Sequence, residues 1–193
     1  MWRSIKNSPY QARYEWIHSP KVPNGNVPKE REVGIRCRDY EGRERIEKRT
    51  DSESDRFESA EIYDPVKELE FIMIGGSQAI VFSSAPDDFS AHTFSLDDGS
   101  AIVLPDAARQ ERIGRYLGEN EIEEMMCVGY SVVDEGKYTL EYWISTELQE
   151  ILQITILTES KRSEYRVFDI RRTNPDKSIF SLPERSQRHL ICL

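Results

Sequence analysis

Alternating hydrophobic and polar residues run through most of the chain. In residues 10–18, Tyr10, Ala12, Tyr14 and Trp16 point one way while the polar residues between them point the other. A period of two is typical of a strand with one buried face. The same period, or a short apolar run closed by turn residues, predicts further strands over 32–39, 43–49, 60–63, 69–74, 79–82, 121–133, 137–144, 151–158 and 162–172.

Only one segment has the pattern of a helix. In residues 105–117, Asp106 can cap the first turn, Ile113 and Leu117 lie on a thin apolar stripe, and Gly118 can end the helix. Polar stretches rich in Pro, Gly, Ser or Asp predict loops over 19–29, 50–59 and 83–100.

These elements predict a mainly β (α+β) fold. We expect a single curled antiparallel sheet, a half-open β-barrel of about 9–11 strands, with one or two helices at its concave face. The sequence has no internal repeat or linker, so we expect one domain over residues 10–183, with tails at 1–9 and 184–193. A curled sheet with a helix at its concave face is a natural container for an apolar ligand.

Charge and composition exclude several classes of protein. The 193 residues carry a net charge of -9, which argues against a general nucleic-acid binder. Residues 57–160 hold 21 acidic and 5 basic residues, whereas both ends are net basic. No stretch approaches the roughly 20 apolar residues that span a bilayer. The first residues, 1–9, do not read as a signal peptide, so the protein is either cytoplasmic or has lost a leader.

Basic and acidic residues mix in the predicted hairpin over 32–49. Guanidinium groups suit phosphate and carboxylate, so the hairpin could bind an anionic partner. Cross-strand pairing within the hairpin is the simpler interpretation. The arginines are Arg36, Arg38, Arg43 and Arg45, and the carboxylates among them are Glu41, Glu44 and Glu47.

No catalytic or metal-binding motif is present. The three histidines lie far apart, so we predict no metal and no cofactor. A hydrolase would need a buried serine or carboxylate paired with a histidine. Glu121 and Glu123 would share a face of one strand, as a solvated edge. Cys37 and Cys127 are expected as small buried hydrophobes; a disulfide between them is possible, and the state of Cys192 is open.

Five short stretches carry a resemblance to a known group. The most specific is a strand followed by Asn174-Pro175-Asp176 and a plug from Phe180 to Pro183; the stretches are 38–47, 62–65, 116–118, 141–148 and 168–183. The chain resembles uncharacterised exported bacterial proteins that are similar to the periplasmic lipoprotein-carrier (Lol-type) superfamily. The resemblance implies a half-open antiparallel barrel, a hydrophobic cavity for acyl chains, and a periplasmic or cell-envelope location.

Two functions remain open. The first is a non-enzymatic carrier or sensor that binds a lipid or lipidated protein inside the half-barrel. The second is a protein-interaction module with a filled core that docks through a sheet face or edge. Aromatic strand residues are the candidate cavity lining: Tyr14, Trp16, Phe71, Tyr142, Trp143 and Phe168.

Overall fold

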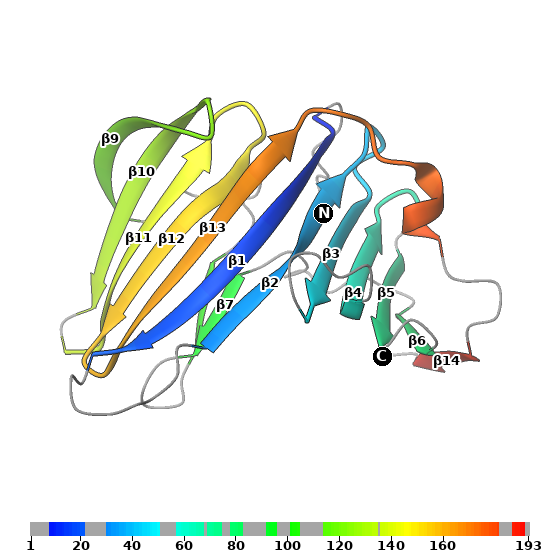
Figure 1. Cartoon of the computed structure of the whole chain (residues 1–193), viewed down its shortest axis with the longest axis horizontal. Helices are drawn as coiled ribbons and strands as arrows, with labels where there is room; N and C mark the ends of the chain where they lie inside the picture. Colours follow the sequence, from blue (N-terminus) through cyan, green and yellow to red (C-terminus); the bar gives the residue numbers. More distant parts are fainter. Residues whose placement is uncertain are drawn as a thin grey trace. The chain divides into compact units, whose positions relative to one another are not determined.

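The computed structural model is almost entirely β-structure (Figure 1). It describes residues 8–21, 30–50, 57–67, 69–74, 78–82, 92–95, 101–104, 114–134, 136–181 and 187–191. The strands are β1 (Tyr10–Pro20), β2 (Glu30–Arg38), β3 (Glu44–Arg49), β4 (Phe57–Asp64), β5 (Leu69–Ile74), β6 (Gln78–Phe82), β7 (His92–Ser95), β8 (Ala101–Leu104), β9 (Arg115–Ile122), β10 (Met125–Asp134), β11 (Tyr138–Ser145), β12 (Glu150–Thr158), β13 (Lys161–Arg171) and β14 (Gln187–Ile191). One short 3₁₀ helix, η2, spans Lys177–Phe180.

Twelve of the strands share one sheet. Their order is β14-β6-β5-β4-β3-β2-β1-β13-β12-β11-β10-β9, and β7 and β8 form a separate pair. The order begins and ends on different strands, so the sheet is open rather than closed. Every pairing with a described register is antiparallel except β14 with β6, which is parallel. The predicted class, a mainly β chain built on a single open antiparallel sheet, is confirmed.

The chain forms two compact units. Unit 1 comprises residues 1–14, 32–89 and 169–193, and unit 2 comprises residues 15–31 and 90–168. In unit 1, β2 and β3 form the predicted hairpin, with Ile35 opposite Glu47. The unit's apolar core includes Cys37, Ala60, Ile62 and Met73, closed by Phe180 and Ile179 of η2. The apolar plug predicted after the last long strand is therefore a short helix packed on the core.

Unit 2 is built on the meander β9–β12 followed by the start of β13 (Figure 1). Its buried face carries one row of side chains that are direct cross-strand partners. The row runs Tyr116, Tyr130, Tyr142, Ile154, Tyr165. All but Tyr116 are almost fully buried, which identifies this face as the core side of the unit. The alternation that predicted these strands decides which side chains face inward.

Several local predictions were wrong. Residues 115–117, expected in a helix, begin β9; residues 105–113 of that helix lie outside the described part. The segment 121–133 is two strands joined by a tight turn at Glu123 and Glu124, whose φ angles are 51° and 61°. Glu121 and Glu123 therefore do not share a strand face. Residues 92–95 and 57–59, expected in loops, are strand.

The tail predicted over residues 184–193 contains β14, which pairs with β6. The tail predicted over residues 1–9 lies mostly outside the described residues, as does Cys192.

Candidate functional site

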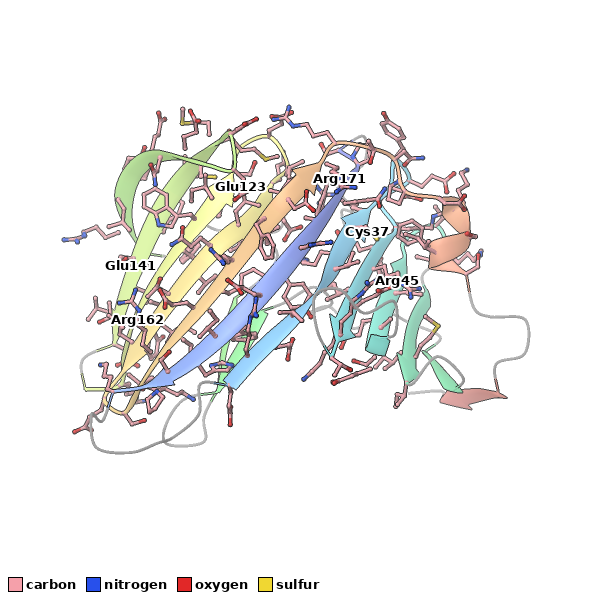
Figure 2. The ribbon with its side chains drawn as sticks, in the orientation of Figure 1. Cys37, Arg45, Glu123, Glu141, Arg162 and Arg171 are labelled. Atoms are coloured by element: carbon pink, nitrogen blue, oxygen red, sulfur yellow. The ribbon has the colours of Figure 1, made fainter. Side chains whose placement is uncertain are left out.

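A cleft of about 460 Å³ opens in unit 2. It lies over β12 and β13, beside the unit-2 end of β1 and the turn between β9 and β10, where Figure 2 labels Glu123. Its apolar lining residues are Ile17 and Ile122, which are half-buried, and Leu152, Ile154, Tyr165 and Val167, whose side chains are almost fully buried. Its polar lining is Glu15, Glu123, Gln153, Glu164 and Arg166. We call it the Glu15 cleft.

Glu15 is the most unusual side chain of this cleft. Only 2 % of its side chain is exposed, yet it is a carboxylate on a strand. Arg31 donates to Glu15 Oε2 from Nε at 3.1 Å and from Nη2 at 2.8 Å. Arg166 donates from Nε to Oε1. A buried carboxylate needs compensating charge and hydrogen bonds, and two guanidinium groups supply both.

The two arginines keep most of their surface in water. Their side chains are 56 % (Arg31) and 65 % (Arg166) exposed, so each reaches from solvent to the buried carboxylate. Arg166 also lies over the ring of Phe168, at 5.3 Å from its centroid. The arrangement fixes a guanidinium group in the wall of the cleft.

The lining carries charged groups of both signs. It holds three carboxylates, from Glu15, Glu123 and Glu164, and one guanidinium, from Arg166. Glu164 pairs at 2.8 Å with Arg162, which is outside the lining. The cleft thus joins an apolar surface to a polar end that carries charges of both signs, which suits an amphipathic ligand better than a purely apolar one.

The aromatic residues predicted to line a cavity are distributed over both units. Tyr14 belongs to unit 1, where its hydroxyl donates to Glu32 Oε1 at 3.2 Å. Phe71 lies in β5 of the same unit, and the structure describes its backbone there. Trp16, in unit 2, packs edge-on against Tyr165 with ring centroids 6.1 Å apart.

The other three aromatics all belong to unit 2. Tyr142 is fully buried and stacks on Tyr130, 5.6 Å between ring centroids. Its neighbour Trp143 points to the opposite face of β11, because successive strand residues alternate. There it covers Gly129, whose missing side chain leaves room for the ring. Phe168 is half-buried under Arg166. None of the six predicted aromatics is in the lining of the Glu15 cleft.

The arginines of the β2–β3 hairpin are mostly inside unit 1. Arg36, Arg38 and Arg45 are all less than 10 % exposed. Arg45 pairs with Glu47 at 2.6 Å, and Arg38 lies 3.7 Å from Glu44. Arg38 and Glu44 are cross-strand partners, as the simpler interpretation expects, whereas Arg45 and Glu47 are neighbours on the same face of β3.

Arg43 lies in the turn of that hairpin. Its Nη2 is 2.6 Å from Asp39 Oδ2 and 3.0 Å from Glu41 Oε2. The guanidinium also sits over the Phe180 ring, at 5.3 Å from its centroid. These contacts occupy Arg43 within unit 1 as well.

One serine–histidine pair meets part of the requirement for a hydrolase. His18 Nδ1 and Ser163 Oγ are 2.8 Å apart in unit 2. Ser163 is only 3 % exposed and lies on the core side of β13, and neither residue is in the lining of the Glu15 cleft. A nucleophile needs access to its substrate, so this pair has the geometry of a structural hydrogen bond.

Metal and thiol chemistry find little support in the described residues. Within them, no group of three or more His, Cys, Asp or Glu side chains could hold a metal ion. Cys37 and Cys127 are both free and buried. Burial raises the pKa of the Cys37 thiol to about 12. In the described part of the chain, no helix is long and apolar enough to cross a membrane.

The sequence analysis did not single out Glu15, Arg31 or Arg166. Glu15 looks like any polar residue on the solvent side of a strand. Its partner Arg166 lies 151 residues further along the chain, so spacing could not reveal the pair. The sequence contained only one indication of this site. Alternate residues of a strand point to the same face, so Glu15 and Ile17 share a face of β1.

No protein-family model matches the chain, and no curated protein matches its sequence. The structure is similar to an uncharacterised conserved protein from Thermus thermophilus, with a TM-score of 0.55 and 15 % identity, over 95 % of this chain and 91 % of that one. That likeness shows a shared fold.

Two further solved structures have lower scores. The complex of Pseudomonas aeruginosa MucA and MucB gives a TM-score of 0.45 at 10 % identity, over 94 % of this chain and 58 % of that one. A LolA superfamily protein from Nitrosomonas europaea gives 0.37 at 10 % identity, over 92 % and 91 %.

Proposed function

We propose that this chain is a non-enzymatic binding protein that takes an amphipathic ligand, a lipid or the acyl chain of a lipidated protein, in the Glu15 cleft. One observation carries the proposal: an open cleft in which the half-buried side chains of Ile17 and Ile122 lie beside a buried carboxylate that holds two arginines. The sequence resemblance to exported Lol-type proteins supports the same class of ligand and a location in the cell envelope.

The size and lining of the cleft suit an acyl chain. A volume of about 460 Å³ lies within the range of small-molecule sites, roughly 300–1,000 Å³. Each CH₂ group that leaves water for an apolar wall contributes about 0.8 kcal/mol. Ile17 and Ile122 are half-buried without ligand, so a chain lying on them would remove further apolar surface from water.

The charge of the lining selects the polar end of the ligand. Carboxylate and guanidinium groups stand side by side in and around the lining, which favours a head group that carries both an ammonium and an anionic group over a free fatty-acid carboxylate. Arg166 can meet a phosphate in the same head group, because its Nε alone is used by Glu15 in the described contacts. A zwitterionic head group matches both charges.

Isothermal titration with palmitoyl lysophosphatidylethanolamine, below its micelle concentration, tests the proposal, with palmitate as the comparison ligand. We expect one site and at least about tenfold tighter binding of the zwitterionic lipid. Ile122→Asp places a charge in the apolar wall at a half-buried turn-proximal position and should weaken binding by at least about tenfold.

Val66→Asp is the matched control, because Val66 is 65 % exposed and belongs to unit 1. It should leave the affinity unchanged. Absence of saturable uptake of either lipid by the unmodified protein, or equal weakening by both variants, would reject the Glu15 cleft as an acyl site and favour the protein-docking alternative.

A further inference from the structure

The outer edge of β9 is a second candidate binding surface. Among the described strands, β9 pairs with β10 on one side and ends the sheet order on the other. Within it, Arg115, Tyr116, Glu119, Asn120 and Glu121 are all exposed. A sheet edge presents main-chain N–H and C=O groups, which an extended peptide can use by adding one more strand.

Three exposed side chains of β9 share one face of the sheet. Glu121, Glu119 and Tyr116 lie opposite Met126, Val128 and Tyr130, which are alternate residues of β10. Directly paired residues lie on the same face, so two carboxylates and one aromatic ring line up along this edge. Tyr116 is 55 % exposed and packs on Tyr130, with ring centroids 5.9 Å apart.

The two carboxylates have no ion pair or hydrogen bond from the described residues. Around them the charge is also negative: unit 2 contains 17 Asp and Glu against 10 Lys and Arg, a net of -7. This field and the paired carboxylates attract a cationic strand.

A second copy of this chain is a poor occupant of this edge. Its own β9 would bring Glu119 and Glu121 against the same acidic row, and like charges facing each other across strands are destabilising. The register of β9 and β10 also shifts between Gly129 and Tyr130, so that Leu117 is an extra residue in the edge strand. Charges and bulges of this kind protect an edge from self-pairing.

We propose that the free edge of β9 binds an extended basic segment of a partner protein by strand addition. The partner places Lys or Arg at two alternate positions, beside Glu121 and Glu119, and an aromatic residue two positions further on, beside Tyr116. β10 itself has this alternate spacing, which makes Lys-x-Lys-x-Tyr the shortest matching pattern. The inference stands on an edge that is outside the Glu15 cleft lining apart from Ile122 and does not depend on the ligand of that cleft.

The experiment uses the full chain and a fluorescent peptide containing Lys-Thr-Lys-Thr-Tyr. Fluorescence anisotropy at low ionic strength should give a Kd on the order of 100 µM or tighter. A second peptide has the same sequence with N-methyl groups on alternate backbone nitrogens. It keeps the charges but cannot form the strand ladder, and it should bind at least about tenfold more weakly.

Charge reversal on the protein gives the matched test. Glu119→Lys with Glu121→Lys should weaken binding of the unmodified peptide by at least about tenfold. Glu141→Lys with Glu159→Lys reverses two exposed charges elsewhere in unit 2 and should change the Kd by less than about threefold. Circular dichroism confirms that both double variants fold.

Three results would overturn the proposal. They are no saturable binding by the unmodified protein, equal binding of the two peptides, and equal weakening by the two double variants. The first result would show that the edge of β9 does not bind the peptide. Either of the other two would show that binding is general electrostatic attraction rather than strand addition at β9. None of them bears on lipid uptake by the Glu15 cleft.

Discussion

The ion pairs of Glu15 make a prediction about non-additivity. Arg31→Ala or Arg166→Ala alone leaves the buried carboxylate one guanidinium partner. Because both arginines are more than half exposed, each single variant should lower the free energy of unfolding by only about 0.5–1 kcal/mol. Together the two changes leave a carboxylate that is 2 % exposed with no cationic partner among the described residues.

Removing the partners of a fully buried charge lowers the free energy of unfolding by about 3–5 kcal/mol. At Glu15 the open cleft admits water once the arginine side chains are gone, so we expect a total of about 2–4 kcal/mol for the double variant. The double variant should therefore exceed the sum of the single ones by at least about 1 kcal/mol. Urea denaturation of the four proteins measures this coupling directly.

A rescue sharpens the same prediction. Glu15→Gln alone removes a charge that both arginines use, so it should destabilise the protein by about 1–3 kcal/mol. In the double arginine variant, Glu15→Gln removes the unpaired buried charge. It should therefore raise the free energy of unfolding of that variant by at least about 1 kcal/mol. Additivity of the two arginine changes within about 0.5 kcal/mol, without rescue by Glu15→Gln, would refute the burial and pairing of Glu15.

Further predictions concern the cores of the two units. A Cβ on Gly129 would lie 2.6 Å from Cζ3 of Trp143, so Gly129→Ala should cost about 1–3 kcal/mol, and Trp143→Val should relieve most of that cost in a double-mutant cycle. Phe180 is 3 % exposed against the unit 1 core, so Phe180→Ala should cost about 3–5 kcal/mol in urea denaturation; less than about 1 kcal/mol would contradict the packing of η2. Burial raises the pKa of the Cys37 thiol to about 12. The stability this gives is complete below the thiol's ordinary pKa and is lost as the pH rises toward 12. Cys37 should therefore resist iodoacetamide at pH 8 until urea unfolds the chain, and rapid labelling of the folded protein would contradict its burial.

Much of the fold could be predicted from the alternation of hydrophobic and polar residues along the strands. The alternation of Tyr10, Ala12 and Tyr14 identified a buried face, and these residues are all less than 5 % exposed. The β2–β3 hairpin and the meander through β11 and β12 were predicted from the same alternation. A strand buried on one face has a hydrophobic residue at every second position. The apolar stretch after β13 was recognised as a plug, and Phe180 fills that place.

The failures have local physical causes. The turn at Glu123 and Glu124 has no Gly, Asn or Asp, so the sequence offered no signal for its positive φ angles. A capping residue and a glycine suggested a helix up to Leu117, but pairing with β10 determines the structure of residues 115–117. Local preference is a weak guide where a neighbouring strand supplies hydrogen bonds.

The candidate site was harder to predict than the fold. Aromatic residues are large and apolar, so they are candidates for both a core and a cavity; Tyr142 is core, and Trp143 covers a glycine on the opposite face. Glu15 became prominent only when folding brought Arg166 to it. The hydrophobic pattern of a single sequence does not reveal which residues far apart in the chain come into contact.

Photo-crosslinking is the most direct test of ligand binding in the Glu15 cleft. Palmitoyl lysophosphatidylethanolamine with a diazirine in its acyl chain is bound to the protein, activated by light, and mapped by peptide mass spectrometry. The account predicts that crosslinks concentrate on Ile122 at the end of β9, on Ile17 of β1 and on Gln153 of β12, and that unlabelled lipid competes them away. Crosslinks that resist competition, or that fall mainly on peptides of unit 1, would contradict it.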